Sequence, residues 1–348
     1  MSQLLARSID QLAGGHDLSQ DESAAVLAEI MSGQANEVEI AAFLIALRIK
    51  GETVEELAGL ARTMREFAAH VPARHHDLLD TAGTGGGRRT FNVSTTAAII
   101  AAGAGCTVAK HGNRSATGLS GSADLLEALG ARIDLGPSEV ARCIDEIGFG
   151  FMFAPAHHPA TRYVIPVRRQ LGVRTTFNFL GPLTNPAGAT RQLLGVSTPD
   201  NLIRMAGALA LLGTRHALLV CGEDGVDELS ISAPTHVVEV TTGGALREYS
   251  VTPEELGLPR HPAEAVPGGD PAENAATTRA ILAGHDGAAR DLAVLNAGAA
   301  IYAGGGAVTL IAGVQVAQEA IDSGAATAKL ERFIDATRQL AGPANATS

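Results

Sequence analysis

The chain has 348 residues, with 26 Lys and Arg against 37 Asp and Glu, and a net charge of −11 at pH 7. An apolar share of 46% excludes intrinsic disorder, and the acidic balance argues against binding to nucleic acid unless basic residues gather in one place. No apolar stretch approaches the ~18 residues of a membrane span, and the N-terminus lacks the apolar core of a secretory signal. We therefore expect a soluble, cytoplasmic protein without nucleic-acid or membrane partners.

The first 72 residues carry helix signals throughout. Ser19 and Glu22 form a capping-box pattern ahead of an apolar run, and Thr53 and Glu56 form another. A helix pattern over residues 40–50 ends at Gly51, which suits a helix C-terminus. These features predict a small all-helical domain over residues 1–72, completed by a helical segment around residues 160–190.

From residue 73 onward, short apolar runs alternate with helix patterns. The runs predict strands at residues 78–80, 106–110, 149–154, 192–197 and 217–221. Helices are predicted from residue 94 and at residues 123–129 and 199–212, and residues 271–340 are predicted as helices apart from a strand at 307–311. The alternation indicates an α/β fold, with a larger domain over residues 73–348 built on a mostly parallel central sheet flanked by helices.

The first loop that could bind a ligand follows the first of these strands, at residues 80–95. Its glycines free backbone N–H groups, and hydroxyls of Thr90, Ser94 and Thr95 lie near the start of the next helix. Such loops bind phosphate oxygens, although the spacing matches neither a dinucleotide fingerprint nor a Walker loop. A tight strand-to-helix turn is the alternative interpretation.

A second polar loop, residues 110–122, follows the next strand. It contains Lys110, His111, Asn113 and Arg114 among glycines and hydroxyls, and Lys110 is one of only three lysines in the chain. Four cations face one acid between residues 80 and 114, so the local charge is +3. Because ligands bind at the carboxyl ends of parallel strands, an anion-binding cradle is favoured over a solvated surface loop.

Residues 157–174 form a second basic segment with four arginines and no acid. Arg168 and Arg169 are adjacent, so at most one of them can point into a shared cleft, where it could hold a carboxylate. His157 and His158 precede Pro159, and a role at a helix start is favoured there over metal binding.

An acidic segment, residues 222–228, follows the strand at 217–221. Asp227 and Glu228 could coordinate Mg²⁺ together with phosphate oxygens and water, whereas solvated turn residues are the alternative.

Taken together, these motifs resemble the anthranilate phosphoribosyltransferases. The resemblance rests on GTGG followed by TFNVST, KHGNR followed by SGSAD and LEALG, PVRRQLGVRT followed by FNFLGPLTNP, and GVDE, in the family's order. It extends from residue 41 to the region of Asn296. It implies a nucleoside phosphorylase-like fold and a pentosyltransferase that joins anthranilate to the ribose of phosphoribosyl pyrophosphate (PRPP), the second step of tryptophan biosynthesis. It also implies Mg²⁺ as cofactor and a homodimer formed through the helical domain.

The resemblance also implies the site residues, without a catalytic acid or base. The PRPP-binding residues would be Gly83, Gly86, Gly87, Thr90, Asn92, Val93, Ser94, Thr95, Lys110, His111, Gly112, Asn113, Arg114, Ser115, Ala116, Thr117, Gly118 and Ser122. The anthranilate-binding residues would be Gly83, His111, Asn113 and Arg168. The Mg²⁺ ligands would be Ser94, Asp227 and Glu228.

Two departures from the family pattern fall on the donor side. The glycine-rich loop is one residue shorter and lacks the usual Asp, and Thr117-Gly118 stands where the family commonly has two serines. We therefore expect Arg88 or Arg89 to contact phosphate, so that replacing them raises the donor KM.

Two other functions compete with this one. A pyrimidine nucleoside phosphorylase would share the fold but differ in the KHGNR and GPLTNP runs. A non-catalytic nucleic-acid-binding relative is disfavoured by the net charge of −11.

Overall fold

The computed structural model describes residues 3–115 and 118–341. Four helices come first: α1 (Gln3–Ala13), α2 (Gln20–Met31), α3 (Glu37–Lys50) and α4 (Val54–Glu66). The helices of the middle part are α5 (Val93–Gly103), α6 (Ser122–Leu129), α7 (Pro137–Ile147), α8 (Ala154–His157), α9 (Ile165–Leu171), α10 (Phe177–Leu180) and α11 (Pro199–Leu211). The last helices are α12 (Pro271–Leu282), α13 (Ala288–Gly304), α14 (Leu310–Asp322) and α15 (Ala325–Leu340).

The described residues form a seven-stranded sheet in the order β3-β2-β1-β4-β5-β6-β7. Its strands are β1 (Leu79–Gly83), β2 (Val108–Gly112), β3 (Phe149–Phe153), β4 (Arg191–Gly195), β5 (His216–Gly222), β6 (Thr235–Val240) and β7 (Leu246–Val251). The first five pair in parallel, whereas β6 and β7 are antiparallel. The predicted α/β fold with a mostly parallel sheet is therefore confirmed.

The strands differ from the sequence-based prediction in two regions of the chain. The hairpin of β6 and β7 was not predicted. The strand predicted at residues 307–311 is wrong, because Thr309 caps the start of α14 by accepting a hydrogen bond from the N–H of Ala312 at 3.1 Å. Val308, just before the cap, is 89% exposed and has no neighbouring strand to pair with among the described residues.

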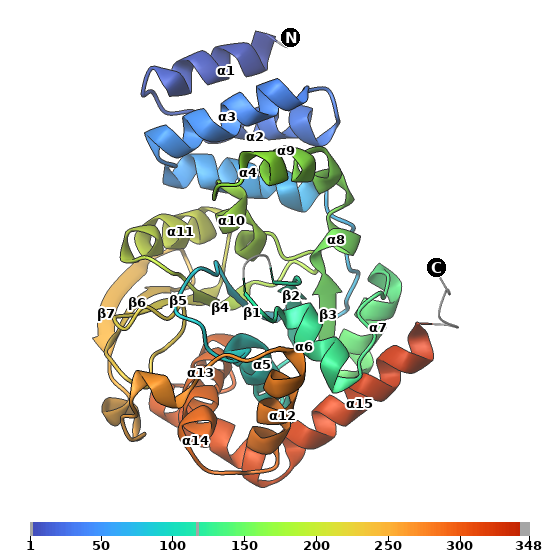
Figure 1. The fold of residues 1–348 in the computed structure, drawn as a ribbon, viewed down its shortest axis with the longest axis vertical. Coiled ribbons are helices and arrows are strands. Elements are labelled where there is room, and N and C mark those ends of the chain that lie inside the picture. Colours follow the sequence, from blue (N-terminus) through green and yellow to red (C-terminus); the bar gives the residue numbers. More distant parts are fainter. Residues whose placement is uncertain (1–2, 116–117, 342–348) are drawn as a thin grey trace.

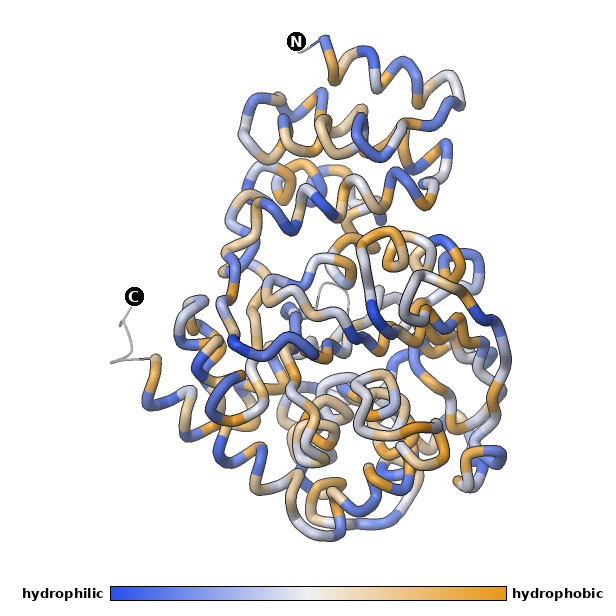
Figure 2. The backbone as a smooth tube through the Cα atoms, turned by 180° about the vertical axis from the view of Figure 1, so that it is seen from behind, coloured by the Kyte–Doolittle hydropathy of each residue, from blue (hydrophilic) through white to orange (hydrophobic). Residues whose placement is uncertain are grey.

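The N-terminal helices begin where the capping signals place them. Ser19 and Glu22 bond each other reciprocally at the start of α2, and Thr53 and Glu56 do so at the start of α4. Hydrophobic and hydrophilic segments alternate along these helices in Figure 2, as expected of amphipathic helices that bury one face. None of the helices in residues 3–115 and 118–341 combines the length and apolar character needed to span a bilayer.

The two faces of the sheet contribute to two apolar cores. One, the helical-side core, joins α1–α4, α9, α10 and α11 to one face of the sheet; the other, the C-terminal core, joins α5–α7 and α12–α15 to the opposite face. Neighbouring strand residues point to opposite cores, as period-two geometry requires: Leu193 and Leu194, Leu218 and Leu219, Val237 and Val238. Figure 1 shows α10 between the N-terminal helices and the sheet, and α9 beside the N-terminal helices, where it contacts α3.

The carboxyl ends of the five parallel strands lie at one edge of the sheet. Strands β1, β2, β4 and β5 each end in a glycine, and the polar loops found in the sequence follow directly. The edge faces the side on which α8, α9 and α10 lie (Figure 1). Loops at the carboxyl ends of parallel strands are the usual place for a ligand in an open α/β sheet.

Candidate active site

The glycine-rich loop between β1 and α5 wraps around the Asp227 carboxylate. Gly85 donates its N–H to Asp227 Oδ2 at 3.0 Å. A Cβ atom at Gly83 would lie 2.9 Å from Asp227 Oδ2, and one at Gly87 would lie 2.8 Å from Asp227 Oδ1. Side chains at either glycine would fill the space around the carboxylate, so the loop and the acidic segment form one recess.

Lys110 lies between β1 and the first turn of α5. Its side chain is buried, and Nζ donates to the Thr81 carbonyl at 2.5 Å, to Thr81 Oγ1 at 3.1 Å and to Ser94 Oγ at 3.4 Å. Burial lowers the pKa of Lys110 to about 8, against the opposing attraction of Asp80. The ammonium therefore ties β2 to β1 and to the first turn of α5, where a phosphate-binding loop needs positive charge.

Asp80 and Asn185, neither of which was a predicted site residue, hold the start of the Lys110 loop. Asp80 accepts hydrogen bonds from the His111 N–H at 3.0 Å and from Asn185 Nδ2 at 2.8 Å. Asn185 Nδ2 also donates to the Ala109 carbonyl at 2.8 Å. Both side chains are buried, so this network fixes where His111 leaves β2.

The rest of this loop places Arg114 away from the recess. Its guanidinium pairs with Asp124 at 2.8 Å and with Glu127 at 2.6 Å, both on α6. Ser115 Oγ accepts a hydrogen bond from the Gly118 N–H at 2.6 Å. Ala116 and Thr117, two of the predicted donor residues, lie outside the described residues. The charge of Arg114 is thus already balanced by acids of the protein.

Asp227 and Glu228 form a half-buried acidic pair beside the glycine-rich loop. Desolvation raises the pKa of both carboxyl groups, and for Glu228 the neighbouring Asp227 raises it further. Glu228 Oε2 accepts a hydrogen bond from Thr90 Oγ1 at 3.1 Å. Within the described ranges neither carboxylate forms an ion pair, so the pair could hold a divalent cation through oxygen ligands, which Mg²⁺ prefers.

Two neutral imidazoles lie side by side, His111 from β2 and His158 directly after α8. The His111 and His158 ring centroids are 5.0 Å apart, and burial lowers the pKa of both rings, that of His158 to about 4. His111 Nδ1 lies 3.2 Å from the Gly181 carbonyl, which leaves its Nε2 as an acceptor. The Nε2 atoms of both rings are buried without a partner among the described residues. The two imidazoles can therefore accept hydrogen bonds from an amine.

Arg168 lies on α9, in the segment that continues through α10 to Gly181, whose carbonyl contacts His111. Its Nη2 is 3.5 Å from Asn178 Oδ1, its guanidinium lies over the Phe177 ring at 5.5 Å, and its buried Nε has no partner in the described residues. It forms no ion pair with a residue of the described ranges, although arginine stays charged in proteins. Since Gly181, which contacts His111, follows α10 directly, one short segment connects the guanidinium to the imidazoles.

Arg88 does not lie free for a phosphate. It pairs with Asp224 at 2.9 Å and donates to the Ala263 carbonyl at 2.9 Å, while its backbone N–H bonds Gly225. The short loop draws this arginine onto the acidic segment, where an opposite charge is already in reach. Contact between Arg88 and phosphate would require this ion pair to open.

We still expect Arg88→Ala to raise the donor KM, by about three- to ten-fold, but through the acidic segment. Removing the half-buried ion pair loosens residues 224–228, with Asp227 among them, at a cost of about 1 kcal/mol. Steady-state kinetics at fixed Mg²⁺ would show the change, and Arg260→Ala, which removes an exposed pair with Glu254, is the control. Equal donor KM values for Arg88→Ala and the wild type would contradict this expectation.

Asn274 is a further residue that the sequence did not single out. From α12 it donates to Asn92 Oδ1 at 2.9 Å, and Ser120 Oγ donates to the same oxygen at 2.9 Å. Asn92 in turn donates to the Ser120 carbonyl at 3.0 Å, so it bridges the two polar loops. No local pattern reveals such a contact, because 182 residues separate Asn92 from Asn274.

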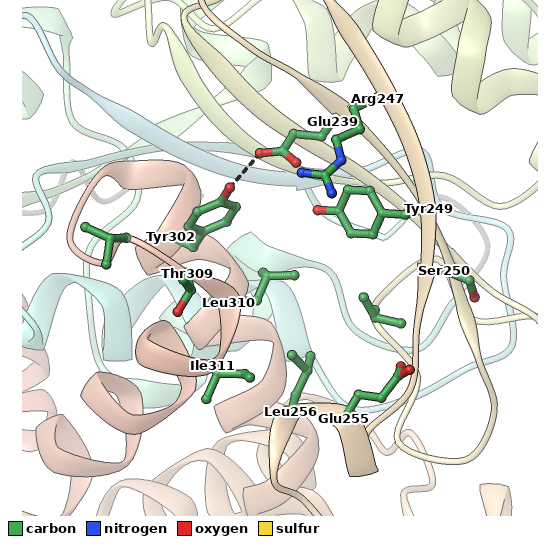
Figure 3. Close-up of a pocket in the computed structure, with 12 residues that line it drawn as sticks. Glu239, Arg247, Tyr249, Ser250, Glu255, Leu256, Tyr302, Thr309, Leu310 and Ile311 are labelled. Carbon is green, nitrogen blue, oxygen red and sulfur yellow. Dashed lines mark hydrogen bonds between the residues drawn. The ribbon is translucent and has the colours of Figure 1, made fainter.

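A separate cavity of about 520 Å³ lies outside this edge, between β7 and the α13–α14 region. Figure 3 shows Tyr302 donating its hydroxyl to Glu239 there, with Arg247 and Tyr249 nearby. None of the predicted site residues that the structure describes lines it.

Comparisons with protein families define the class of protein. The helical bundle domain of the glycosyl transferase family matches residues 6–68, and the a/b domain of that family matches residues 75–327. Fold and site thus define a glycosyl transferase with a helical bundle and an α/β domain.

Individual relatives sharpen this class. The anthranilate phosphoribosyltransferase of Rubrobacter xylanophilus is 52% identical over 341 residues, covering 97% of this chain and 99% of that protein. The crystal structure of the enzyme from Thermus thermophilus is 46% identical with a TM-score of 0.90, covering 95% and 99% of the two chains. The Saccharomyces cerevisiae enzyme in complex with PRPP and Mg is 30% identical with a TM-score of 0.89, covering 98% and 99%. The chain belongs to the anthranilate phosphoribosyltransferase family, and the resemblance found in its motifs is confirmed.

Proposed function

We propose that this protein transfers the phosphoribosyl group of PRPP to the amine of anthranilate, which gives N-(5-phosphoribosyl)anthranilate and pyrophosphate. Arg168 carries this proposal: its guanidinium has no carboxylate partner in the described residues, and the free Nε2 atoms of His111 and His158 can accept hydrogen bonds. Anthranilate supplies both counterparts, since its carboxylate pairs with a guanidinium and its amine donates to Nε2 atoms. Relatives with this name, over nearly the full chain, support the same substrates.

We propose that the donor binds at the glycine-rich loop and the loop that follows β2. The glycine-rich loop offers backbone N–H groups at the N-terminus of α5, which attracts phosphate, and Lys110 adds charge through Ser94. The residues that would line the diphosphate and ribose are Gly83, Gly86, Gly87, Thr90, Asn92, Val93, Ser94 and Thr95, with Lys110 to Ser115, Gly118 and Ser122 from the second loop. Arg114 would take part through its backbone, because Asp124 and Glu127 hold its side chain.

Asp227, Glu228 and the Ser94 hydroxyl would hold Mg²⁺. Neither carboxylate forms an ion pair with a described residue, and their space is kept open by Gly83 and Gly87. Solved relatives bind Mg, one of them together with PRPP. A bound ion neutralises charge that builds up on the departing diphosphate. Its remaining ligands would be phosphate oxygens and water.

The chemistry then asks the protein mainly to position two substrates. Displacement at the anomeric carbon passes through an oxocarbenium-like state, so alignment and charge stabilisation lower the barrier. Hydrogen bonds from the amine to His111 and His158 would orient its lone pair, and the carboxylate on Arg168 would fix the ring. The amine proton becomes acidic once the C–N bond forms, so we assign no catalytic base.

The helical domain is proposed to extend over residues 1–72 and 160–190, with the α/β domain over residues 73–348. Val167 and Phe177 share the helical-side core with Leu57, which supports the first part of this division. A cytoplasmic location is also part of the proposal, and the three free, buried cysteines are compatible with it.

We propose a homodimer through α3. Val38 and Ile49 on this helix are 78% and 80% exposed. Together with Ala41, Ala42 and Ile45 they follow the spacing i, i+3, i+4, i+7 and i+11, which forms one apolar stripe on a helix. The small alanines in the middle let a second helix approach closely, so a second copy of this chain suits the stripe.

Ile49→Asp is expected to shift the protein from dimer to monomer, because it places an unpaired charge in an apolar interface. Sedimentation velocity measures the change, and Val308→Asp, at an 89% exposed site of the α/β domain, is the matched control. A wild-type monomer, or a dimer that survives Ile49→Asp, would refute the α3 interface.

The transfer reaction is tested by the loss of anthranilate fluorescence in the presence of PRPP and Mg²⁺. Loss of anthranilate that requires the protein, PRPP and Mg²⁺ together supports the proposal. Unchanged fluorescence at saturating donor, with folded protein, would rule it out.

A further inference from the structure

Arg174 reaches from the helical side of the molecule onto the glycine-rich loop. It lies between α9 and α10, whose residues Val167 and Phe177 belong to the helical-side core. Its Nη2 donates to the Thr84 carbonyl at 3.2 Å and to the Gly85 carbonyl at 3.1 Å. The guanidinium thus connects a segment of the helical layer to the loop after β1, 89 residues earlier in the chain.

Gly86 leaves the space in the glycine-rich loop that the Arg174 guanidinium occupies. Gly86 has φ +94°, a conformation that L side chains rarely adopt, and a Cβ atom there would lie 2.2 Å from Arg174 Nη1. The backbone conformation at position 86 therefore favours glycine, and a side chain there would displace the Arg174 guanidinium. Gly86 was predicted to contact the donor, and the structure gives it a second reason to be glycine.

Gly85 is held from two sides. Its carbonyl accepts from Arg174, while its N–H donates to Asp227 Oδ2 at 3.0 Å. Arg174 and Asp227 also attract each other electrostatically. With both contacts in place, the peptide groups of residues 84–86 cannot turn without breaking charge-assisted hydrogen bonds, which are the stronger kind.

We propose that Arg174 is a positioning residue that holds the glycine-rich loop in the conformation that receives the diphosphate of the donor. The inference rests on the proposed function, because it assigns the donor diphosphate to this loop. Arg174 occupies the carbonyl oxygens of Thr84 and Gly85, while the N–H groups of Gly86 and Gly87 form no hydrogen bond with a described residue and stay available to the anion. Because Arg174 and Arg168 belong to the same segment, that of α9 and the loop after it, this segment contacts both the proposed donor site and the proposed acceptor site.

The test compares Arg174→Gln, Arg174→Lys and Arg169→Gln by calorimetric titration of PRPP with Mg²⁺ and without anthranilate. Arg169 is the control because it is an exposed arginine on α9, close in sequence. We expect Arg174→Gln to weaken donor binding about ten-fold, through loss of two hydrogen bonds from a charged donor. Arg174→Lys should restore part of the affinity, since it keeps the charge but not the fork, and Arg169→Gln should bind like the wild type.

Kinetics separate positioning from a general structural effect. We expect the donor KM of Arg174→Gln to rise with the dissociation constant, while the anthranilate KM stays within about two-fold and the melting temperature is unchanged. Wild-type donor affinity in Arg174→Gln, or an equal loss for both substrates, would overturn the inference. Donor binding by a wild type that transfers nothing to anthranilate would reject the proposed function and leave this inference standing, whereas no donor binding would reject both.

Discussion

Asp227→Asn is expected to lower kcat/KM by about 100-fold or more, the size of effect found when one charged group that stabilises a transition state is removed. The asparagine keeps the size of the side chain and an oxygen for the Gly85 N–H, so the change removes charge while it preserves shape. Steady-state kinetics over a range of Mg²⁺ and PRPP concentrations would measure it. Higher Mg²⁺ should restore only part of the rate.

Stability gives the same variant a second readout. Desolvation raises the pKa of Asp227 in the folded protein, so the stability that this group supplies is present below its unfolded pKa and is lost as pH rises through the folded value. At pH 7 the charge is therefore unfavourable without a cation, and Asp227→Asn should melt no lower than the wild type. It should gain less from added Mg²⁺ and PRPP. Glu223→Gln, which alters an exposed acid of the same segment, is the control.

A lower melting temperature with unchanged gain from ligand would show that Asp227 is structural. Full activity of Asp227→Asn would remove the acidic pair from the site altogether.

Arg168→Ala is expected to raise the KM for anthranilate by about 100-fold, with a smaller effect on the donor KM. A charge-assisted pair with a carboxylate contributes about 1.5–3 kcal/mol, and in the ligand-free protein no ion pair with a described residue replaces it. Arg168→Lys should recover only part of this, because lysine lacks the planar fork. Initial rates at saturating PRPP measure the effect.

Arg169→Ala is the matched control, since the two arginines are adjacent and Arg169 is exposed. An anthranilate KM that rises for Arg169→Ala and not for Arg168→Ala would reverse the assignment. Equal loss for both would indicate that the positive charge of α9 matters and not one guanidinium.

Local sequence patterns predict the central strands of the sheet. The prediction failed at the β6–β7 hairpin and at residues 307–311. Strands β1 to β5 are short apolar runs between helices, so residue type and period reveal them. The hairpin of β6 and β7 also has a local signal that the prediction missed: an alternating run before Gly243 and Gly244, which take φ values of 92° and 80° in its turn. At residues 307–311 an apolar run was read as a strand, and the capping side chain of Thr309 decides for a helix.

The sequence predicts the loops of the site but not the residues that hold those loops in place. Glycines, hydroxyls and basic residues after strands mark the donor side, and the motifs add Arg168 and the acidic pair. Arg174, Asn185 and Asn274 act through partners 76 to 182 residues away, which only the fold brings together. Arg88 and Arg114 show the converse: both are basic residues in the right loops, yet nearby acids hold their guanidinium groups.

The most direct test of the account is the stoichiometry of the reaction. Purified protein with PRPP, Mg²⁺ and anthranilate should release one pyrophosphate for each anthranilate consumed, and it should not cleave thymidine or uridine in the presence of phosphate. Release of a pyrimidine base, with anthranilate and PRPP left intact, would contradict the account and favour a nucleoside phosphorylase.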